Sequence, residues 1–202
     1  MATKTERYTT PKGTAKYPWL NTPDTKFNPD GEYKTSLVLP LEEADTIMQF
    51  LDEQLAKSIA QAKKDNPGKK VKEADAPYSV NEETGELSIN FKLKAKVTPQ
   101  KGDPFEQKPA VFDAKGKPLQ GVNVGGGSTI KVSYEVYPFY TAMIGAGISL
   151  RLKAVQVLNL VEFSGGAGAQ AYGFGEEDGF ESESNDSPFK VEEEDEENPR
   201  DF

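Results

Sequence analysis

The chain has 202 residues and a formal net charge of −9, and it contains neither cysteine nor histidine. This composition excludes a disulfide framework, thiolate or imidazole metal ligands and His-dependent catalytic triads, so we expect no cofactor and no metal. No apolar run approaches the roughly 20 residues of a membrane span, and no signal peptide opens the chain, so we expect a soluble protein without membrane contacts.

The N-terminal part predicts two strands and one helix. Residues 1–32 are rich in Pro, Gly, Thr and Asn, and we expect irregular chain there apart from a short strand over residues 15–20. Turn residues 28–31 precede a β-branched, apolar stretch that predicts a strand over residues 33–39. Apolar residues spaced three and four apart then predict a helix over residues 41–64.

The clearest strand covers residues 86–97, where apolar side chains alternate with Ser, Asn and Lys. A hairpin over residues 110–122 and a strand over residues 129–137 follow. In a last strand over residues 148–163 the apolar residues change parity after Ala154. This change predicts a β-bulge, which is a device that bends a sheet.

Five or six long, bent strands with one inserted helix predict a mainly β fold. A small barrel leaves fewer free strand edges than a sandwich, and an OB-fold barrel with a helix between two strands fits these elements best. We expect this domain to occupy residues 1–163. A Gly-rich linker and a polar, highly charged tail follow over residues 164–202, and we expect that part to be disordered.

The charge is divided unevenly between these two parts. Residues 1–163 carry a net charge of +2 and residues 164–202 carry −11, which indicates a cationic surface with a tethered polyanion beside it. The polyanion either serves solubility alone, or competes with DNA and anchors partner proteins through its final aromatic residue. The tail residues predicted to bind partners are Glu192, Glu193, Glu194, Asp195, Glu196, Glu197, Asp201 and Phe202.

Basic side chains of outward parity lie on several predicted strands. Lys92, Lys94 and Lys96 stand roughly 7 Å apart by strand rise, close to the phosphate spacing of an extended single strand. If the strands are neighbours, these cations form a stripe that follows a nucleic-acid backbone; an ordinary solvated face is the competing interpretation. The cations predicted to contact DNA are Lys34, Lys92, Lys94, Lys96, Lys131, Arg151 and Lys153.

Three aromatic residues, Tyr137, Phe139 and Tyr140, surround Pro138 at the end of a predicted strand. A strand end has little room to bury all three rings. Exposed aromatic rings beside cations form stacking platforms for bases, whatever the base sequence. The alternative interpretation is that the rings close one end of the barrel.

No group of residues predicts catalysis. The glycine-rich residues 124–128 lack the lysine of a P-loop, so we expect only a tight loop there. The paired glutamates at 42–43 and 82–83 lie at a predicted helix start and a predicted turn, and the helix dipole explains the first pair. A nuclease or polysaccharide-binding enzyme that works without histidine is disfavoured as well, because no paired carboxylates converge on one site, and we therefore do not expect an enzyme.

Several segments, taken in order, resemble the single-stranded DNA-binding proteins of T-odd coliphages and related podoviruses. No single segment is specific, but the ordered set is. The segments are residues 28–34, 91–94, 111–117, 125–132, residues 136–140 leading to Gly145-Ala146, and the acidic tail ending in Asp201-Phe202.

The resemblance implies an OB-fold that binds single-stranded DNA without sequence preference, as a homodimer, in the cytoplasm of an infected bacterial host. It implies a tail that docks on the phage DNA polymerase and helicase–primase and regulates access to DNA. By position, Lys92 and Lys94 would contact the DNA backbone, Phe139 and Tyr140 would stack on bases, and Phe202 would dock on partners.

Two hypotheses follow. The first is a non-catalytic single-stranded DNA-binding protein of phage DNA replication, recombination and repair. The second is a protein-interaction or chaperone-like module whose tail mimics nucleic acid. Asp30 stands where this family leads us to expect a basic residue, so no DNA contact is expected at that position.

Overall fold

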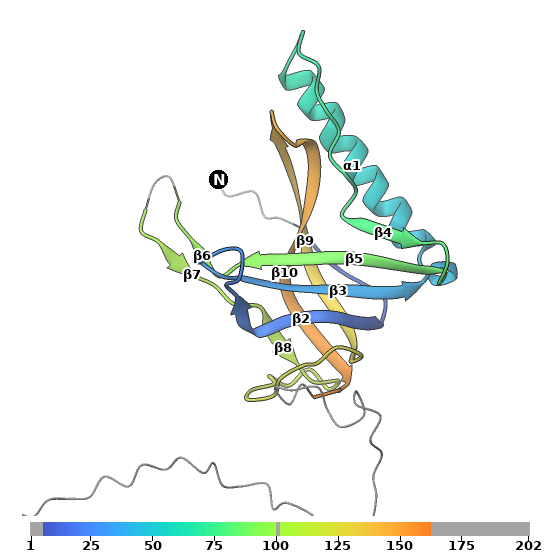
Figure 1. Ribbon diagram of the computed structural model, residues 1–202, viewed down its shortest axis with the longest axis vertical. Helices are drawn as coiled ribbons and strands as arrows, with labels where there is room; N and C mark the ends of the chain where they lie inside the picture. The colour runs from blue at the N-terminus through green and yellow to red at the C-terminus, as the bar shows by residue number, and fades with distance from the viewer. Residues whose placement is uncertain (1–5, 100–101, 163–202) are drawn as a thin grey trace, which may run out of the picture. The chain divides into compact units, whose positions relative to one another are not determined.

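The computed structural model describes residues 6–99 and 102–162. Within these residues the chain forms ten strands, one α-helix and one short 3-10 helix (Figure 1). The predicted disorder of residues 164–202 and the predicted partner-binding residues of the tail lie outside them. No helix among the described residues is long and apolar enough to cross a bilayer.

The elements follow one another as β1 (Arg7–Thr9), β2 (Gly13–Asp24), β3 (Glu32–Pro40), the 3-10 helix η1 (Leu41–Glu43), α1 (Asp45–Asp65), β4 (Tyr78–Asn81), β5 (Glu86–Lys94), β6 (Lys96–Val97), β7 (Phe105–Glu106), β8 (Ala110–Phe112), β9 (Thr129–Thr141) and β10 (Gly145–Asn159).

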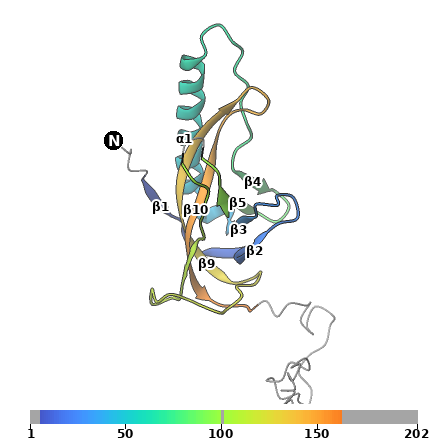
Figure 2. The same cartoon turned by 90° about the vertical axis from the view of Figure 1, so that its left-hand side faces the viewer.

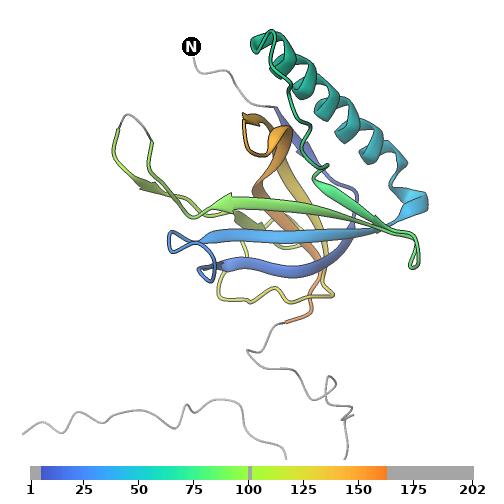
Figure 3. The same ribbon diagram turned by 45° about the horizontal axis from the view of Figure 1, so that its top comes forward.

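One strongly curled sheet contains all of these strands except β6 and β7, which form a small hairpin of their own. Pairings link β2 to β3, β3 to β5, β5 to β10 and β10 to β9, and β9 pairs in turn with β2. Within that series only the β5–β10 pair is parallel. Figures 1 and 3 show the consequence: β2, β3 and β5 cross over β9 and β10.

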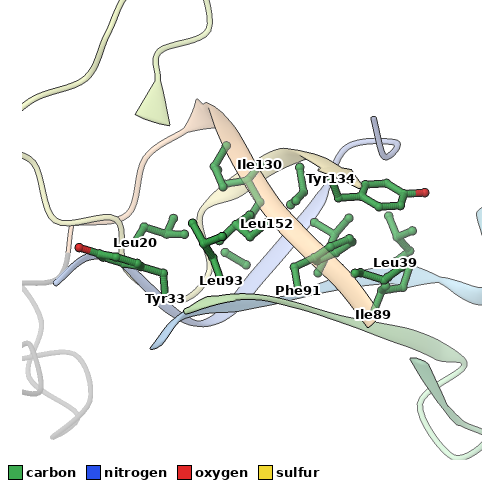
Figure 4. Packing of buried hydrophobic residues seen from close by; sticks show 14 of the residues in the cluster. Leu20, Tyr33, Leu39, Ile89, Phe91, Leu93, Ile130, Tyr134 and Leu152 are labelled. Atoms are coloured by element: carbon green, nitrogen blue, oxygen red, sulfur yellow. The ribbon is translucent and has the colours of Figure 1, made fainter. Parts of the chain in front are cut away.

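The core lies between these two crossing sets of strands (Figure 4). Ile89, Phe91 and Leu93 of β5 are buried and face Ile130 and Leu152 across the core. Since successive side chains of a strand point to opposite faces, burying this row places the intervening lysines of β5 outside. The alternation predicted for residues 86–97 is confirmed, and it links the core directly to the outer surface.

The helix α1 packs beside the hairpin formed by β9 and β10 (Figure 2). It buries Ile47 and Leu51, and the ring of Phe50 lies 4.6 Å from that of Tyr8, centroid to centroid. Further along, the hydroxyl of Ser58 donates a hydrogen bond of 2.8 Å to the carbonyl oxygen of Gly147. The hydrogen bond from Ser58 fixes α1 against β10 and so holds the β9–β10 hairpin in place.

Three local predictions agree with the structure. η1 and α1 together cover the predicted helix at residues 41–64 almost completely, and β3 covers the strand predicted over residues 33–39. The predicted parity change appears as a register shift between Leu152 and Ala154, which leaves Lys153 as the extra residue of a bulge. A bulge increases local bending, and here it lies where β10 crosses the sheet.

The N-terminal region contains more strand than the sequence predicts. β2 has 12 residues, and β1 and β4 have no counterpart in the prediction. The register of β2 shifts between Lys16 and Trp19 and again between Trp19 and Asp24, so its side chains do not alternate regularly. β1 has only 3 residues, which is too few for a period to be recognised.

The hairpins also differ from their predicted extents. The predicted single strand over residues 86–97 is interrupted at Ala95, and the second arm of the predicted 110–122 hairpin is reduced to a bridge between Phe112 and Pro118. β9 continues past Pro138, which lies opposite Ile148. Proline lacks the N–H of a regular ladder, which is why the sequence predicts an end there, but pairing on both sides carries the strand through.

Two tyrosines make the free energy of unfolding depend on pH in the alkaline range. Burial raises the pKa of Tyr134 to about 12. Burial, together with a 2.6 Å hydrogen bond donated to Asp52, raises the pKa of Tyr78 to about 12. In the unfolded chain the phenols ionise near pH 10. The stability due to the neutral phenols is therefore complete below about pH 10 and is lost as pH rises toward 12.

We expect the urea midpoint to fall between about pH 10 and 12, and to fall less in Tyr134→Phe, which keeps the ring and removes the ionisable group. Lysine deprotonation affects both proteins equally, so the difference between them isolates Tyr134. Parallel pH profiles of the two midpoints would contradict the expectation.

Candidate nucleic-acid interface

A row of basic side chains crosses three strands on the outer face of the sheet. Lys34 of β3 lies opposite Lys92 of β5, and Lys92 lies opposite Arg151 of β10. Residues directly opposite one another share a face, and neighbouring strands are about 4.8 Å apart, so the Cα atoms of these three residues lie within roughly 10 Å. We call Lys34, Lys92 and Arg151 the cationic row. The structure thus brings together cations that are far apart in the sequence.

The row is extended along β5 by Lys94, which lies on the same face opposite Glu32. Lys92 and Lys94 are both exposed, and within the described part of the chain neither forms a salt bridge. Lys96 is also exposed, but it belongs to β6, where it lies opposite Glu106. Two cations of β5 are therefore available to a ligand without first breaking an ion pair.

Lys34, by contrast, is already paired. Its ammonium group donates a hydrogen bond of 2.5 Å to the carboxylate of Asp24, which is almost buried. That hydrogen bond, with a second one from the backbone N–H of Lys26, lowers the pKa of Asp24. Asp24 is therefore ionised at neutral pH and compensates the charge of Lys34.

At the β10 end the row meets aromatic side chains. The guanidinium carbon of Arg151 lies 4.1 Å from the centroid of the Tyr137 ring, and Tyr137 is 45% exposed. Phe139 follows on the same face of β9 and lies opposite Gly147, where a side chain would meet its ring at 2.7 Å. Arg151, Tyr137 and Phe139 thus form a cation–aromatic group of the kind that stacks on bases.

The structure does not bring every predicted residue to this group. Tyr140 lies opposite Ala146, and alternation along β9 places it on the other face of the hairpin from Tyr137 and Phe139. Lys131 lies opposite Gln156, farther along β9 from the cationic row. Both positions follow from strand pairing.

Lys153 lies near the row, but it is partly engaged. As the bulge residue it approaches Glu135 to 3.8 Å, and Arg7 of β1 approaches the same carboxylate to 3.4 Å. Glu135 is only 7% exposed, so two cations surround one nearly buried anion. This cluster ties β1 to β9 and β10, and it leaves Arg151 as the β10 cation that faces the row.

Aromatic residues of β2 and of the loop that follows it complete the surface, and the sequence does not predict a role for them. Trp19 lies opposite Lys34 and is 43% exposed. Tyr17 and Phe27 are more exposed, and each has a lysine ammonium group within 6 Å of its ring centroid. One feature of the sequence could have indicated this role. The three aromatic residues lie in a stretch rich in Pro, Gly and Asn, where no alternation of apolar and polar residues predicts that they are buried.

No metal centre accompanies this surface in the described residues, which contain no group of three or more acidic side chains placed to hold an ion. The face of β3, β5 and β10 offers cations with aromatic rings beside them, the combination that binds a single-stranded polyanion by charge and stacking.

Comparisons with known proteins agree with this geometry. A family model described as "Single-stranded DNA-binding protein, Bacteriophage T7" matches residues 12–160. A single-stranded DNA-binding protein of Enterobacteria phage T3 is 32% identical over 188 residues, which cover 81% of this chain and 80% of that protein. One of Escherichia phage T7 is 30% identical over 184 residues, covering 79% and 78%. Both are named as binding proteins and not as enzymes.

Solved structures are similar as well. The crystal structure of gp2.5, a single-stranded DNA-binding protein encoded by bacteriophage T7, matches with a TM-score of 0.70 at 27% identity, covering 88% of this chain and 99% of that one. The single-stranded DNA-binding protein from bacteriophage Enc34 in complex with ssDNA matches with a TM-score of 0.58 at 16% identity, covering 79% and 89%. The second match concerns the fold alone.

Proposed function

The chain belongs to the bacteriophage T7 family of single-stranded DNA-binding proteins, and we propose that it binds single-stranded DNA, without sequence preference, on the outer face of β3, β5 and β10. The observation that carries the proposal is the alignment of Lys34, Lys92 and Arg151 across three strands, with Tyr137 at one end. The family consists of binding proteins, and the proposed function involves no catalysis.

The two kinds of side chain make different contributions to binding. Lysine and arginine neutralise phosphates and release condensed counterions, which gives affinity that falls steeply with salt. Rings such as that of Tyr137 stack on bases, and each stacked base contributes about 1–3 kcal/mol irrespective of its identity. Neither interaction reads the hydrogen-bonding edge of a base, and this is the physical reason for binding without sequence preference.

We assign the curled sheet to the OB-fold, with β2, β3, β5, β9 and β10 as its five barrel strands. The return of the pairing series from β9 to β2 supports this assignment. OB-folds bind oligonucleotides on the face of their second and third strands and with the loops that follow the first and fourth. In this chain those elements are β3, β5 and the loops at residues 25–31 and 142–144, so the fold and the cationic row indicate the same face.

The proposal extends to the role of the protein in infected cells. It would coat exposed strands during phage DNA replication, recombination and repair in the bacterial cytoplasm, as a homodimer. The acidic residues 192–197 together with Asp201 and Phe202 would recruit the phage DNA polymerase and helicase–primase. Support for this part comes from the charge of −11 over residues 164–202 and from the family resemblance.

Removal of the carboxylate beside Lys34 should strengthen binding. In Asp24→Asn, Lys34 loses its ion pair and becomes free to contact a phosphate. The side-chain oxygen of asparagine can still accept the hydrogen bond from the backbone N–H of Lys26. We expect an affinity gain of roughly fourfold at about 0.15 M salt and a salt slope steeper by about 0.7.

Glu53→Gln is the matched control for this measurement, because it makes the same charge change on α1, outside the proposed DNA face. Like Asp24, Glu53 forms an ion pair with a lysine, in this case with Lys57, whose Nζ lies 3.8 Å from its Oε2. An equal gain in both variants would mean that the effect is one of net charge and that Lys34 does not contact DNA.

The function itself is tested by titrating full-length protein into fluorescent oligo-dT, a mixed-sequence oligonucleotide of equal length, and the corresponding duplex. We expect similar tight binding to both single strands and weaker binding to the duplex. Binding to none of them, with protein partners still captured through the tail, would favour the protein-interaction module instead.

A further inference from the structure

A cavity of about 550 Å³ opens between β2 and the glycine-rich loop that precedes β9. Its volume lies in the range of small-molecule sites, roughly 300–1,000 Å³. The lining combines aromatic and aliphatic surface with two side-chain amides and exposed backbone. The residues that matter here are Tyr17, Trp19 and Asn21 on β2 and Asn123, Gly125 and Gly126 on the loop.

The β2 wall of this cavity has an unusual backbone. Tyr17 has φ of +50° and is, within the described residues, the one non-glycine residue with positive φ. Such a conformation is uncommon for a bulky residue and costs energy unless the surroundings impose it. Here it accompanies the register shift after Lys16 and leaves Tyr17 71% exposed at the mouth of the cavity. The chain thus holds an aromatic ring outward at a conformational cost.

The opposite wall is fixed by hydrogen bonds. The side-chain amide of Asn21 donates to the carbonyl oxygen of Val122 and, at 3.3 Å, to the side-chain oxygen of Asn123. The hydroxyl of the fully buried Ser128 donates to the carbonyl oxygen of Gly125 at 2.8 Å, and the N–H of Gly125 donates to that of Val161 at 2.7 Å. The loop is therefore tied to β2 and to Val161, just beyond the end of β10, and the cavity between the loop and β2 is a preformed site.

The cavity adjoins the cationic row. Trp19, which lines it, lies opposite Lys34, the β3 member of the row. A strand whose phosphates follow Arg151, Lys92 and Lys34 therefore arrives at the mouth of the cavity as it crosses onto β2. None of the lining residues is charged, so the interior suits a flat, neutral group with polar edges better than a phosphate.

We propose that this cavity receives one base of the bound DNA strand, turned out of its stack and held against Trp19 and Tyr17, while the neighbouring phosphates stay on the cationic row. The inference rests on the proposed function and adds to it a defined base subsite with a position in the strand path. Aromatic rings favour stacking on any base, and the amides of Asn21 and Asn123 provide polar groups at the rim.

Trp19 reports on this site directly, because it is the only tryptophan of the chain. Tryptophan emission would be followed while full-length protein is titrated with oligo-dT and, separately, with an abasic oligonucleotide that has the same number of phosphates. We expect quenching by oligo-dT, and little quenching by the abasic strand even when anisotropy shows that it is bound. Equal quenching by both strands would overturn the base subsite.

A variant that fills the cavity gives the second test. Gly126 lines it and has room for a side chain, since the nearest atom to an added Cβ is the carbonyl oxygen of Ala15 at 3.9 Å. We expect Gly126→Leu to bind oligo-dT about five- to a hundredfold more weakly, the loss of one stacked base, with an unchanged salt slope. Gly126→Ala is the matched control and should bind like the wild type.

Tyr17→Gly provides an independent test of the subsite in case Gly126→Leu does not fold. Glycine adopts positive φ without strain, which offsets the greater conformational entropy of glycine in the unfolded chain. The change should therefore leave the melting temperature nearly unchanged while it removes the ring. We expect weaker binding and reduced Trp19 quenching. Wild-type affinity in Gly126→Leu and Tyr17→Gly would overturn the subsite and leave the proposed function intact, whereas failure of the wild type to bind any oligonucleotide would overturn both.

Discussion

Replacement of Lys92 and Lys94 together by alanine is expected to weaken binding to single-stranded DNA roughly tenfold at about 0.15 M salt, and several-fold more at about 0.05 M. The two lysines lie on the outer face of β5, between β3 and β10, and their ammonium groups are free of ion pairs in the described residues. The bound strand must cross them if it follows the cationic row.

The salt dependence is the sharper readout. Each phosphate contact of a single strand contributes about 0.7 to the slope of log K against log salt, so loss of two contacts should lower the slope by about 1.4. The measurement is anisotropy of labelled oligo-dT across a series of salt concentrations. Since both residues are exposed, the free energy of unfolding should change little.

Lys57→Ala combined with Lys64→Ala is the control, because it removes the same charge from α1. Both side chains are exposed, and Lys57 lies 3.8 Å from Glu53 of the same helix. We expect this variant to keep the wild-type slope. If the Lys92/Lys94 variant also keeps it, the DNA path lies elsewhere on the protein.

Deletion of residues 164–202 should leave DNA binding intact or make it tighter, with the largest gain at low salt. The deleted part carries a net charge of −11, and tethering gives it an effective concentration of roughly millimolar order at the cationic surface. At about 1 M salt the Debye length falls to roughly 3 Å, so the difference between the two proteins should then disappear. The described core residues all lie between Ala15 and Val157, so we expect the shortened chain to fold.

Two further variants separate the effect of the acidic residues 192–197 on DNA binding from the effect of Phe202 on partner binding. Substitution of the acidic residues 192–197 by their amides keeps the length of the tail, and it should reproduce the tighter DNA binding. Phe202→Ala should leave DNA affinity unchanged while it abolishes capture of the phage polymerase and helicase–primase. Weaker DNA binding by the 1–163 protein would contradict competition between tail and DNA.

The sequence predicts those elements whose pattern is local. Apolar and polar residues alternate along β5. Because neighbouring residues of a strand point to opposite faces, this pattern predicts both the buried Phe91 and the exposed Lys92. The sequence predicts α1 equally well, because its apolar residues recur at three- and four-residue spacing. The bulge at Lys153 is visible because the apolar residues on either side of it change parity.

What the sequence does not predict depends on pairing between distant segments. The opposition of Lys34, Lys92 and Arg151 requires the register of three strands, and register cannot be read from any one of them. Tyr140 lies on the other face from Tyr137 and Phe139, because β9 continues past Pro138 and its side chains keep alternating between the two faces. Trp19 joins the surface only because the irregular strand β2 pairs with β3.

Photo-crosslinking shows whether the DNA strand lies across β3, β5 and β10. Oligo-dT carrying 5-iodouracil would be crosslinked to full-length protein, and the modified peptides would be identified by mass spectrometry. We expect crosslinks at Tyr137, Phe139 and Trp19, the aromatic residues beside the cationic row. Crosslinks confined to Phe105 in β7 or to Tyr78 in β4 would place the DNA on another face and rule out this path.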